Sequence, residues 1–362
     1  MLLITVQLCI LLGGILQAAL RRSNPVHAWL SMAGYTIYVF ITGARWRTGT
    51  DWLPYEHAFS VLKSNSPEAL GGSFEPGFAI FMELFSKTFG VYPLFLFVAS
   101  VCIAFLLYWS ARLAKLPPLL FIAFLFMAQS QFWYPVRQQL AIAVCIFSVS
   151  FAFSESKHSL LRYCAPIVGA SLVHSSSLIT LSIIAKAKSL SKARLFAMLG
   201  LFIVLCAIAA PFMAGFFESR ITSYIYENAY EFESSRSIFR LIERLFTGGL
   251  LLYLLTRHGL HEFDVRMMST IRFCLLAGLA ISAFALLSFP YLARLASYFN
   301  WIEALIASSA VLHARRASSF TRLVTALVIV VFAFKYVGSL ASYWDLLDPY
   351  YFFFESVDRS MY

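Results

Sequence analysis

The sequence contains few charged residues. Asp, Glu, Lys and Arg make up only 13% of its 362 residues, whereas soluble domains carry about 25%. No polar segment exceeds roughly 30 residues, which is too short to build an independent hydrophobic core. A separate soluble domain is therefore excluded, and lipid must be the main solvent of this chain.

The sequence also lacks the motifs of nucleotide, metal and redox chemistry. It has no Walker A motif, no HExxH, no DxD and no GxGxxG that opens a helix after a strand, so neither ATP nor a nucleotide sugar is an expected substrate. Its acidic residues form no tight ligand cluster, and we expect no metal and no other cofactor. The six cysteines lie in or at apolar runs without a CxxC or Cys/His pattern, which predicts neither disulfide nor zinc.

Basic residues exceed acidic ones, but they form no long block. The net charge is +10. In a membrane protein such an excess is typical of cytoplasmic loops and headgroup contacts. A nucleic-acid partner would need a clustered basic footprint, and none is present.

Long apolar runs fill most of the chain. The hydrophobic share is 60%, with 36 phenylalanines, and a spanning helix needs about 20 apolar residues, sometimes as few as 17. Arg21 and Arg22 follow the first run instead of preceding it, which favours a membrane helix over a cleavable signal. The runs predict spans near 2–20, 27–44, 91–111, 117–133, 137–154, 195–214, 239–256, 271–289, 292–312 and 321–342.

Two apolar stretches do not fit a single straight span. Residues 160–187 are too many for one crossing and are interrupted at His174 by three following serines, which predicts a hairpin of two short helices. Residues 76–89 are too few and too polar for a full crossing. We expect a re-entrant or interfacial helix there, with its backbone covered by protein or water.

Basic residues in short loops predict the orientation. With Arg21 and Arg22 inside, the inner loops hold most of the remaining Lys and Arg: Arg112, Lys115, Lys157, Arg162, Lys186, Lys188, Lys192, Arg194, Arg257, Arg266, Arg272, Arg315, Arg316 and Arg322. Such loops are cytoplasmic in membrane proteins. The pattern predicts one transmembrane domain over 1–362, with about 12 crossings, outer loops at 45–75 and 215–240, and an outer C-terminal tail at 343–362.

Three arginines then lie at outer helix ends or loops, namely Arg47, Arg137 and Arg294. Arginine binds phosphate in bidentate fashion and is always charged. A single arginine at such a place often only reaches for lipid headgroups. Three of them on one face favour a site for a polyanion such as a lipid diphosphate.

For each of the other polar residues on this face, the sequence allows two roles. Glu75 precedes Pro76 and either caps the helix that follows or acts as a base. His174 is either a structural residue at a helix end or a group that moves a proton. Asp51 either orients Arg47 or acts as the base. Glu303 lies inside a predicted span, where it pairs internally or faces a cavity.

Six motifs occur in an order that resembles the EpsG-like family. They are RTGTDWLPYEHAF, FEPGFAIFMELF, YPVRQQLAIAV, LVHSSSLI, LARLASYF and DPYYFFFE, and the resemblance runs from about residue 40 to the C-terminus. The family comprises polytopic proteins of exopolysaccharide and O-antigen loci, regarded as Wzy-type polymerases. The matching residues are Arg47, Gly49, Asp51, Tyr55, Glu75, Pro76, Gly77, Arg137, Gln138, His174, Ser175, Arg294 and Tyr298.

The resemblance implies an all-α, GT-C-like glycosyltransferase of the bacterial inner membrane with its site facing the periplasm. The implied donor and acceptor are undecaprenyl-diphosphate-linked glycans, and a flippase and a chain-length regulator are expected partners. We expect Arg47, Arg137 and Arg294 to hold the diphosphate, and Gln138, Tyr55 and Tyr298 to contact diphosphate or glycan. The base is one of Asp51, Glu75 and His174, with His174 preferred because a carboxylate beside arginines is a weaker base.

Three other functions remain open from the sequence. A ligase that attaches finished glycan to another acceptor would share the donor chemistry. A flippase or transporter would need charged groups along a path through the bilayer, and only Glu303 points that way. A membrane acyltransferase would draw its acyl donor from inside, where only ordinary basic loops are found.

Overall fold

The chain is helical wherever the structure describes it. A computed structural model describes residues 1–48, 52–64, 74–133, 136–154, 160–187, 234–257, 265–287, 293–341 and 352. In these residues the only β pairing is an isolated bridge between Arg45 and Phe352. The prediction of an all-α protein is therefore confirmed for the described part, while the predicted span 195–214 and most of the outer loop 215–240 and of the tail lie outside it.

The first half of the chain forms helices close to the predicted ranges. They are α1 (Leu2–Ala19), α2 (Pro25–Gly43), α3 (Trp52–Lys63), α4 (Pro76–Thr88), α5 (Tyr92–Leu113), α6 (Pro118–Ala128), the 3₁₀ turn η2 (Ser130–Trp133) and α7 (Arg137–Ser154). The local sequence determines where α2 begins. The side chain of Asn24 accepts a hydrogen bond from the Val26 N–H at 2.9 Å, and Pro25 occupies the first turn of α2.

The second half adds α8 (Leu160–Ser171), η3 (Ser175–Thr180), α9 (Leu181–Ala187), α11 (Ser234–Arg257), α12 (Val265–Leu287), α13 (Ala293–His313), η6 (Ala314–Arg316) and α14 (Ser319–Ala341). The predicted hairpin over 160–187 is confirmed, because α8 ends before His174 and η3 begins directly after it. Helix α11 begins five residues earlier than the predicted span near 239.

Five described helices are long and apolar enough to cross a membrane: Leu2–Ala19, Tyr92–Leu113, Met267–Ala285, Arg294–Arg316 and Ser319–Ala341. Other apolar helices, α7 among them, are shorter. The structure therefore supports an all-α membrane protein. The number of about 12 crossings stays a prediction.

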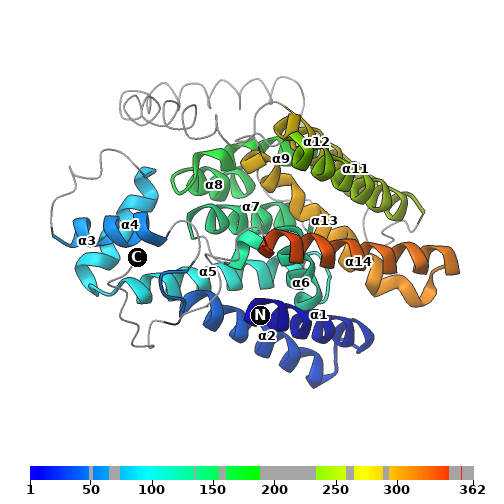
Figure 1. The fold of residues 1–362 in the computed structure, drawn as a ribbon, viewed down its shortest axis with the longest axis horizontal. Coiled ribbons are helices and arrows are strands. Elements are labelled where there is room, and N and C mark those ends of the chain that lie inside the picture. The colour runs from blue at the N-terminus through cyan, green and yellow to red at the C-terminus, as the bar shows by residue number, and fades with distance from the viewer. Residues whose placement is uncertain are drawn as a thin grey trace.

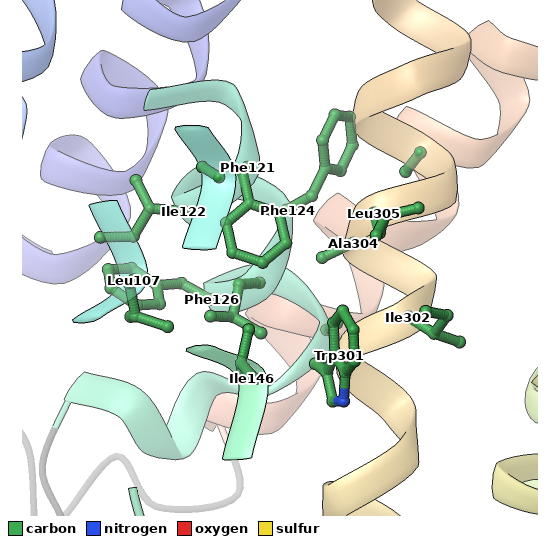
Figure 2. Packing of buried hydrophobic residues seen from close by; sticks show 14 of the residues in the cluster. Leu107, Phe121, Ile122, Phe124, Phe126, Ile146, Trp301, Ile302, Ala304 and Leu305 are labelled. Atoms are coloured by element: carbon green, nitrogen blue, oxygen red, sulfur yellow. The ribbon is translucent and has the colours of Figure 1, made fainter. Parts of the chain in front are cut away.

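Helix α6 lies at the centre of the bundle and is too short to cross a membrane. Every one of its 11 residues is buried, and α1, α13 and α14 pack around it. Figure 2 shows Phe124 of α6 directed at α13, where Ala304 and Leu305 lie, and Trp301 of α13 directed back toward α6. Eleven helical residues cover only about 16 Å of a hydrocarbon core of about 30 Å, so the predicted span 117–133 is too long.

The bundle has two distinct ends. Helices α3 and α4 lie at one end, on the left of Figure 1, and the turns between α1 and α2 and between α13 and α14 lie at the other. At that second end the Arg22 guanidinium donates to the Lys115 carbonyl. Arg22, Lys115 and the turn that holds Arg315 and Arg316, all predicted to be cytoplasmic, thus lie at one end of the bundle. The orientation relative to a membrane stays a prediction.

The predicted outer loop 45–75 contains a helix that we did not expect. Helix α3 packs against α4 in a second apolar cluster that includes Tyr55, Phe59, Phe78 and Phe95. The polar residues of this stretch had suggested a loop, but its aromatic residues bury one face of α3. Helix α4 confirms a helix over 76–89, and its re-entrant placement in the membrane stays a prediction.

Candidate functional site

Several predicted site residues meet where α4, α7, η3 and α13 approach one another. Glu75 stands at the start of α4, Arg137 at the start of α7, His174 before η3 and Tyr298 in the second turn of α13. All four are at least nine-tenths buried. The residues come from distant parts of the sequence, and only the helix packing brings them together.

Glu75 and Arg137 form a buried ion pair. Nη1 of Arg137 donates to Oε2 of Glu75 at 2.8 Å, and the two side chains are 9% and 2% exposed. The other carboxylate oxygen accepts from the backbone N–H of Ser175 at 3.3 Å and from its hydroxyl at 3.5 Å. The Glu75 side chain makes no capping hydrogen bond to α4. Glu75 occupies the N-cap position of α4, but its carboxylate contacts Arg137 and Ser175, so it is more than a plain helix cap.

Arg137 keeps a donor beyond this pair. Its Nε has no hydrogen-bond partner among the described residues, and its guanidinium carbon lies 5.3 Å from the centre of the Phe74 ring. The ion pair and the ring hold the guanidinium in one orientation. A buried donor that the protein leaves unused is suited to an anionic ligand.

A close backbone contact positions Glu75. A Cβ at Gly77 would lie 2.7 Å from Cβ and 2.8 Å from the carbonyl oxygen of Leu172. Glycine removes this clash, and the Phe78 N–H donates to the same carbonyl at 3.1 Å. The start of α4 is therefore fixed against the end of α8, directly beside His174.

His174 and Tyr298 are joined by a hydrogen bond. The Tyr298 hydroxyl lies 3.2 Å from Nδ1 of His174, and Tyr298 is completely buried. The sequence had suggested that Tyr298 contacts glycan or diphosphate. In the structure its hydroxyl lies beside His174 and the side chain is fully buried, and a contact of Tyr298 with ligand stays a prediction.

Gln138 and Arg294 connect α7 to α13 at the same end. Nε2 of Gln138 donates to the Arg294 carbonyl at 3.3 Å. The Arg294 side chain is exposed, as a group that meets a ligand from the surroundings would be. The predicted grouping of Arg137, Gln138 and Arg294 on one face agrees with this arrangement.

Arg47 lies at the edge of this region with a carboxylate partner that the sequence did not suggest. Its Nε is 3.3 Å from Oε2 of Glu56, and its guanidinium carbon lies 5.3 Å and 5.5 Å from the centres of the Trp46 and Trp52 rings. Asp51, which we expected to orient Arg47, lies outside the described residues. Glu56 could have been found only by recognising α3, since the helix turns it back toward Arg47.

Tyr55 packs under the site. Its ring centre is 5.6 Å from that of Phe74 and 5.7 Å from that of Phe78, and it is 5% exposed. Phe74 also lies against Arg137. Tyr55 therefore links α3 to Arg137 through Phe74, and direct contact with glycan stays a prediction.

Arg45 was also missed from the sequence. It is 5% exposed, its Nη1 donates to the Trp133 carbonyl at 3.3 Å, and its backbone pairs with Phe352. This cation ties the end of α2 to η2 and to the C-terminal segment. Only its place in the run of arginines after α2 could have drawn attention to it.

Glu303 belongs to a separate buried cluster. Its two oxygens contact Arg244 at 2.8 Å and Lys335 at 3.3 Å. Of the two readings from the sequence, internal pairing is confirmed. The three residues sit on α13, α11 and α14, so their charges join three helices within the bundle.

The comparisons with known proteins agree with these motifs. A family model described as the EpsG family matches residues 28–352. No curated protein matches the chain, and no solved structure matches it, so a GT-C-like fold stays a prediction. The match covers nearly the whole chain, including most of α2, all of α3 to α14 and every residue of the site. The protein therefore belongs to the EpsG family.

Proposed function

We propose that the protein is a polysaccharide polymerase of the bacterial inner membrane. It transfers a glycan from a polyprenyl diphosphate, of the undecaprenyl class, to a hydroxyl of another lipid-linked repeat unit on the periplasmic face. Membership of the EpsG family supports the coarse role in polysaccharide polymerisation. The finer reaction rests on the chemistry of the site.

One observation carries the proposal: the buried Arg137 guanidinium is held by Glu75, and its Nε has no hydrogen-bond partner among the described residues. In the transfer, the acceptor oxygen bonds to the anomeric carbon while the bond from that carbon to the diphosphate oxygen breaks. Negative charge grows on the departing diphosphate, and the hydroxyl proton passes to a base or to the diphosphate itself. A fixed cation at this place stabilises the growing charge without reorganising.

The remaining residues take roles around this reaction. Arg294, exposed at the start of α13, and Arg47 are proposed to reach the diphosphate from the outer side, and Gln138 positions the backbone of Arg294. Candidates for the base are Asp51, Glu75 and His174. Glu75 is the weakest of these, because its two oxygens already accept from Arg137 and Ser175.

A ligase for finished glycan is the closest alternative, since it uses the same donor. A flippase is less well supported: in the part of the bundle that the structure describes, Glu303 is paired with Arg244 and Lys335. A path for a charged substrate would instead present such groups to a cavity.

A deletion strain separates the three functions. Loss of a polymerase leaves one repeat unit on the final acceptor, loss of a ligase leaves none, and loss of a flippase accumulates lipid-linked units that face inward. We expect single repeat units, restored to long chains by the wild-type gene and not by Arg137→Ala at equal protein level. Long chains made by Arg137→Ala would contradict the proposal.

A further inference from the structure

Arg45 is a buried cation that has no carboxylate partner in the described part of the chain. It follows the end of α2 by two residues, and its exposed fraction is only 5%. Nη1 donates to the Trp133 carbonyl at 3.3 Å, and this is the one hydrogen bond of the guanidinium among the described residues. A guanidinium has five N–H donors and always keeps its charge. The described residues therefore compensate neither the charge nor most of the donors.

The other buried charges in the described part of the chain are paired. Besides Arg45, the buried Asp, Glu, Lys and Arg residues there are Glu75, Arg137 and Glu303. Glu75 and Arg137 bind each other at 2.8 Å, and Glu303 binds two cations at 2.8 Å and 3.3 Å. A buried charge without a partner is costly, and such an exception requires its own explanation. An anionic ligand would supply the missing charge.

The neighbours of Arg45 hold it in place without neutralising it. Its backbone pairs with that of Phe352, whose ring centre lies 5.6 Å from that of Phe40. Trp133 is completely buried, and its indole N–H has no hydrogen-bond partner among the described residues. A cation attracts an anion more strongly in apolar surroundings than in water. Arg45 is therefore suited to phosphate, which arginine can bind in bidentate fashion.

Arg45 lies near Arg137 but has different contacts. Arg45 binds the Trp133 carbonyl, and Arg137 begins α7 four residues after Trp133, a length of chain that spans at most about 14 Å. Arg137 contacts Glu75 and Phe74, whereas Arg45 contacts η2 and the C-terminal segment. The pair of Arg137 and Glu75 has no net charge, whereas Arg45 brings a full positive charge. The two arginines can therefore hold two separate phosphate groups.

We propose that Arg45 is a second phosphate-binding site, which holds the diphosphate of the acceptor while Arg137 holds that of the donor. The proposal rests on the proposed function for the identity of the ligand, because that reaction joins two lipid-linked units and each carries a diphosphate. The acceptor diphosphate breaks no bond during the transfer, so it needs only a fixed cation that binds it. The phosphate of an ordinary phospholipid has the same chemistry, and the binding experiment separates the two sources.

The number of bound diphosphates tests the second site without any activity. Full-length protein in phosphatidylcholine nanodiscs receives undecaprenyl diphosphate, and native mass spectrometry counts the molecules bound to each protein. We expect two on the wild-type protein, with one of them bound at least tenfold more weakly by Arg45→Met. The control Arg315→Met, which replaces an exposed arginine at the opposite end of the bundle, should still bind both. Unchanged binding of both by Arg45→Met would overturn the proposal.

Two further arms identify the ligand at each site. The double variant Glu75→Gln/Arg137→Met leaves no stranded ion at the first site and should keep only the diphosphate at Arg45. Phosphatidylglycerol added to the nanodiscs should leave both diphosphates bound. Loss of the one at Arg45 as phosphatidylglycerol increases would mean that a phospholipid headgroup occupies this site, and would overturn the acceptor role.

The same count distinguishes failure of this proposal from failure of the proposed function. A wild-type protein that binds a single diphosphate, lost in the Glu75→Gln/Arg137→Met variant, would refute the site at Arg45 and leave the polymerase intact. A wild-type protein that binds no diphosphate would contradict the proposed function itself.

The melting temperature of the free protein tests whether Arg45 lacks a partner. Arg45→Met removes a buried charge that no described carboxylate compensates, whereas Arg137→Met leaves Glu75 stranded. We therefore expect Arg45→Met to lower the melting temperature less than Arg137→Met does. An equal or larger decrease would show that Arg45 is paired in the free protein, and would overturn the proposal.

Kinetics separate the acceptor from the donor. The donor is a lipid-linked repeat unit whose acceptor hydroxyl is replaced by hydrogen, and the acceptor is a unit joined to its diphosphate through carbon, so that it cannot donate. We expect Arg45→Met to raise the KM of this acceptor at least tenfold and to leave the KM of the donor unchanged. The same acceptor glycan on an uncharged lipid alcohol should be insensitive to the substitution. A raised KM for the donor, or equal effects on both acceptors, would overturn the assignment.

Discussion

The ion pair between Glu75 and Arg137 makes the sharpest prediction about the site. Its partners are 2.8 Å apart with side chains 2% and 9% exposed. Removal of one partner from such a pair strands a charge in the interior and costs about 3–5 kcal/mol. We expect Glu75→Gln and Arg137→Met each to lower the free energy of unfolding by that amount.

The double variant decides whether the two residues act as a pair. With both charges gone no unpaired ion remains, so Glu75→Gln/Arg137→Met should be clearly more stable than the sum of the single losses predicts. The assay is denaturant unfolding of purified protein in micelles, followed by tryptophan fluorescence. The exposed pair of Glu83 and Lys87, with nitrogen and oxygen 2.6 Å apart, is the matched control and should show a coupling below about 1 kcal/mol.

Activity and stability should separate in the same variants. The double variant regains stability but still lacks the guanidinium that we propose to stabilise the diphosphate, so it should make no long polymer. Strictly additive losses of stability would refute the reasoning about the pair. Long polymer from the double variant would refute the role of Arg137.

Two further changes test how the bundle positions the site. Gly77→Ala places a Cβ 2.7 Å from Leu172, so it should destabilise the protein by about 1–3 kcal/mol and shorten the polymer. Stability is measured as the melting temperature, and polymer length on a gel. The control Gly169→Ala, with nothing within 4 Å of the added Cβ, should change neither. Glu303→Gln removes the carboxylate that pairs with Arg244 and Lys335, two cations with side chains 18% and 13% exposed, and should cost about 3 kcal/mol. The exposed Glu83→Gln should cost less than about 1 kcal/mol. Equal melting temperatures within either pair would contradict the contacts described.

Helix positions were predicted best where a polar boundary encloses an apolar run. Helix α7 has the predicted bounds 137–154, because Arg137 begins the run and polar residues end it. The run 117–133 is apolar up to Ala128 and is then interrupted by Gln129, Ser130 and Gln131. An apolar run of this kind is equally typical of a membrane span and of a buried core helix. The structure shows that α6 ends at Ala128, directly before these polar residues, and that it is buried in the protein.

The residues that form the site were easier to predict than the contacts between them. Alternation of the loops placed Glu75, Arg137 and His174 on one face, and the structure brings them together. Sequence distance is a poor guide to partners, however. Arg137 pairs with Glu75, which is 62 residues away in the sequence. Arg47, which we expected to contact the nearby Asp51, contacts Glu56 on α3, a helix that we did not predict.

The partners of buried charges inside the bundle were equally hard to predict from the sequence. Glu303 was visible in the sequence as a carboxylate within an apolar run. Its partners Arg244 and Lys335 lie 59 and 32 residues away on other helices, and nothing in the local pattern marks them. Packing of α11, α13 and α14 creates these pairs, so they can be found only in three dimensions.

Chain growth by the purified protein tests the central claim most directly. The protein in nanodiscs receives only polyprenyl-diphosphate-linked repeat units, with a chelator present and no nucleotide, and products are separated by size. The account predicts chains of many repeats from the wild-type protein and none from a folded Arg137→Ala variant. Failure of the wild-type protein to join two repeats, or equal chains from Arg137→Ala, would contradict it.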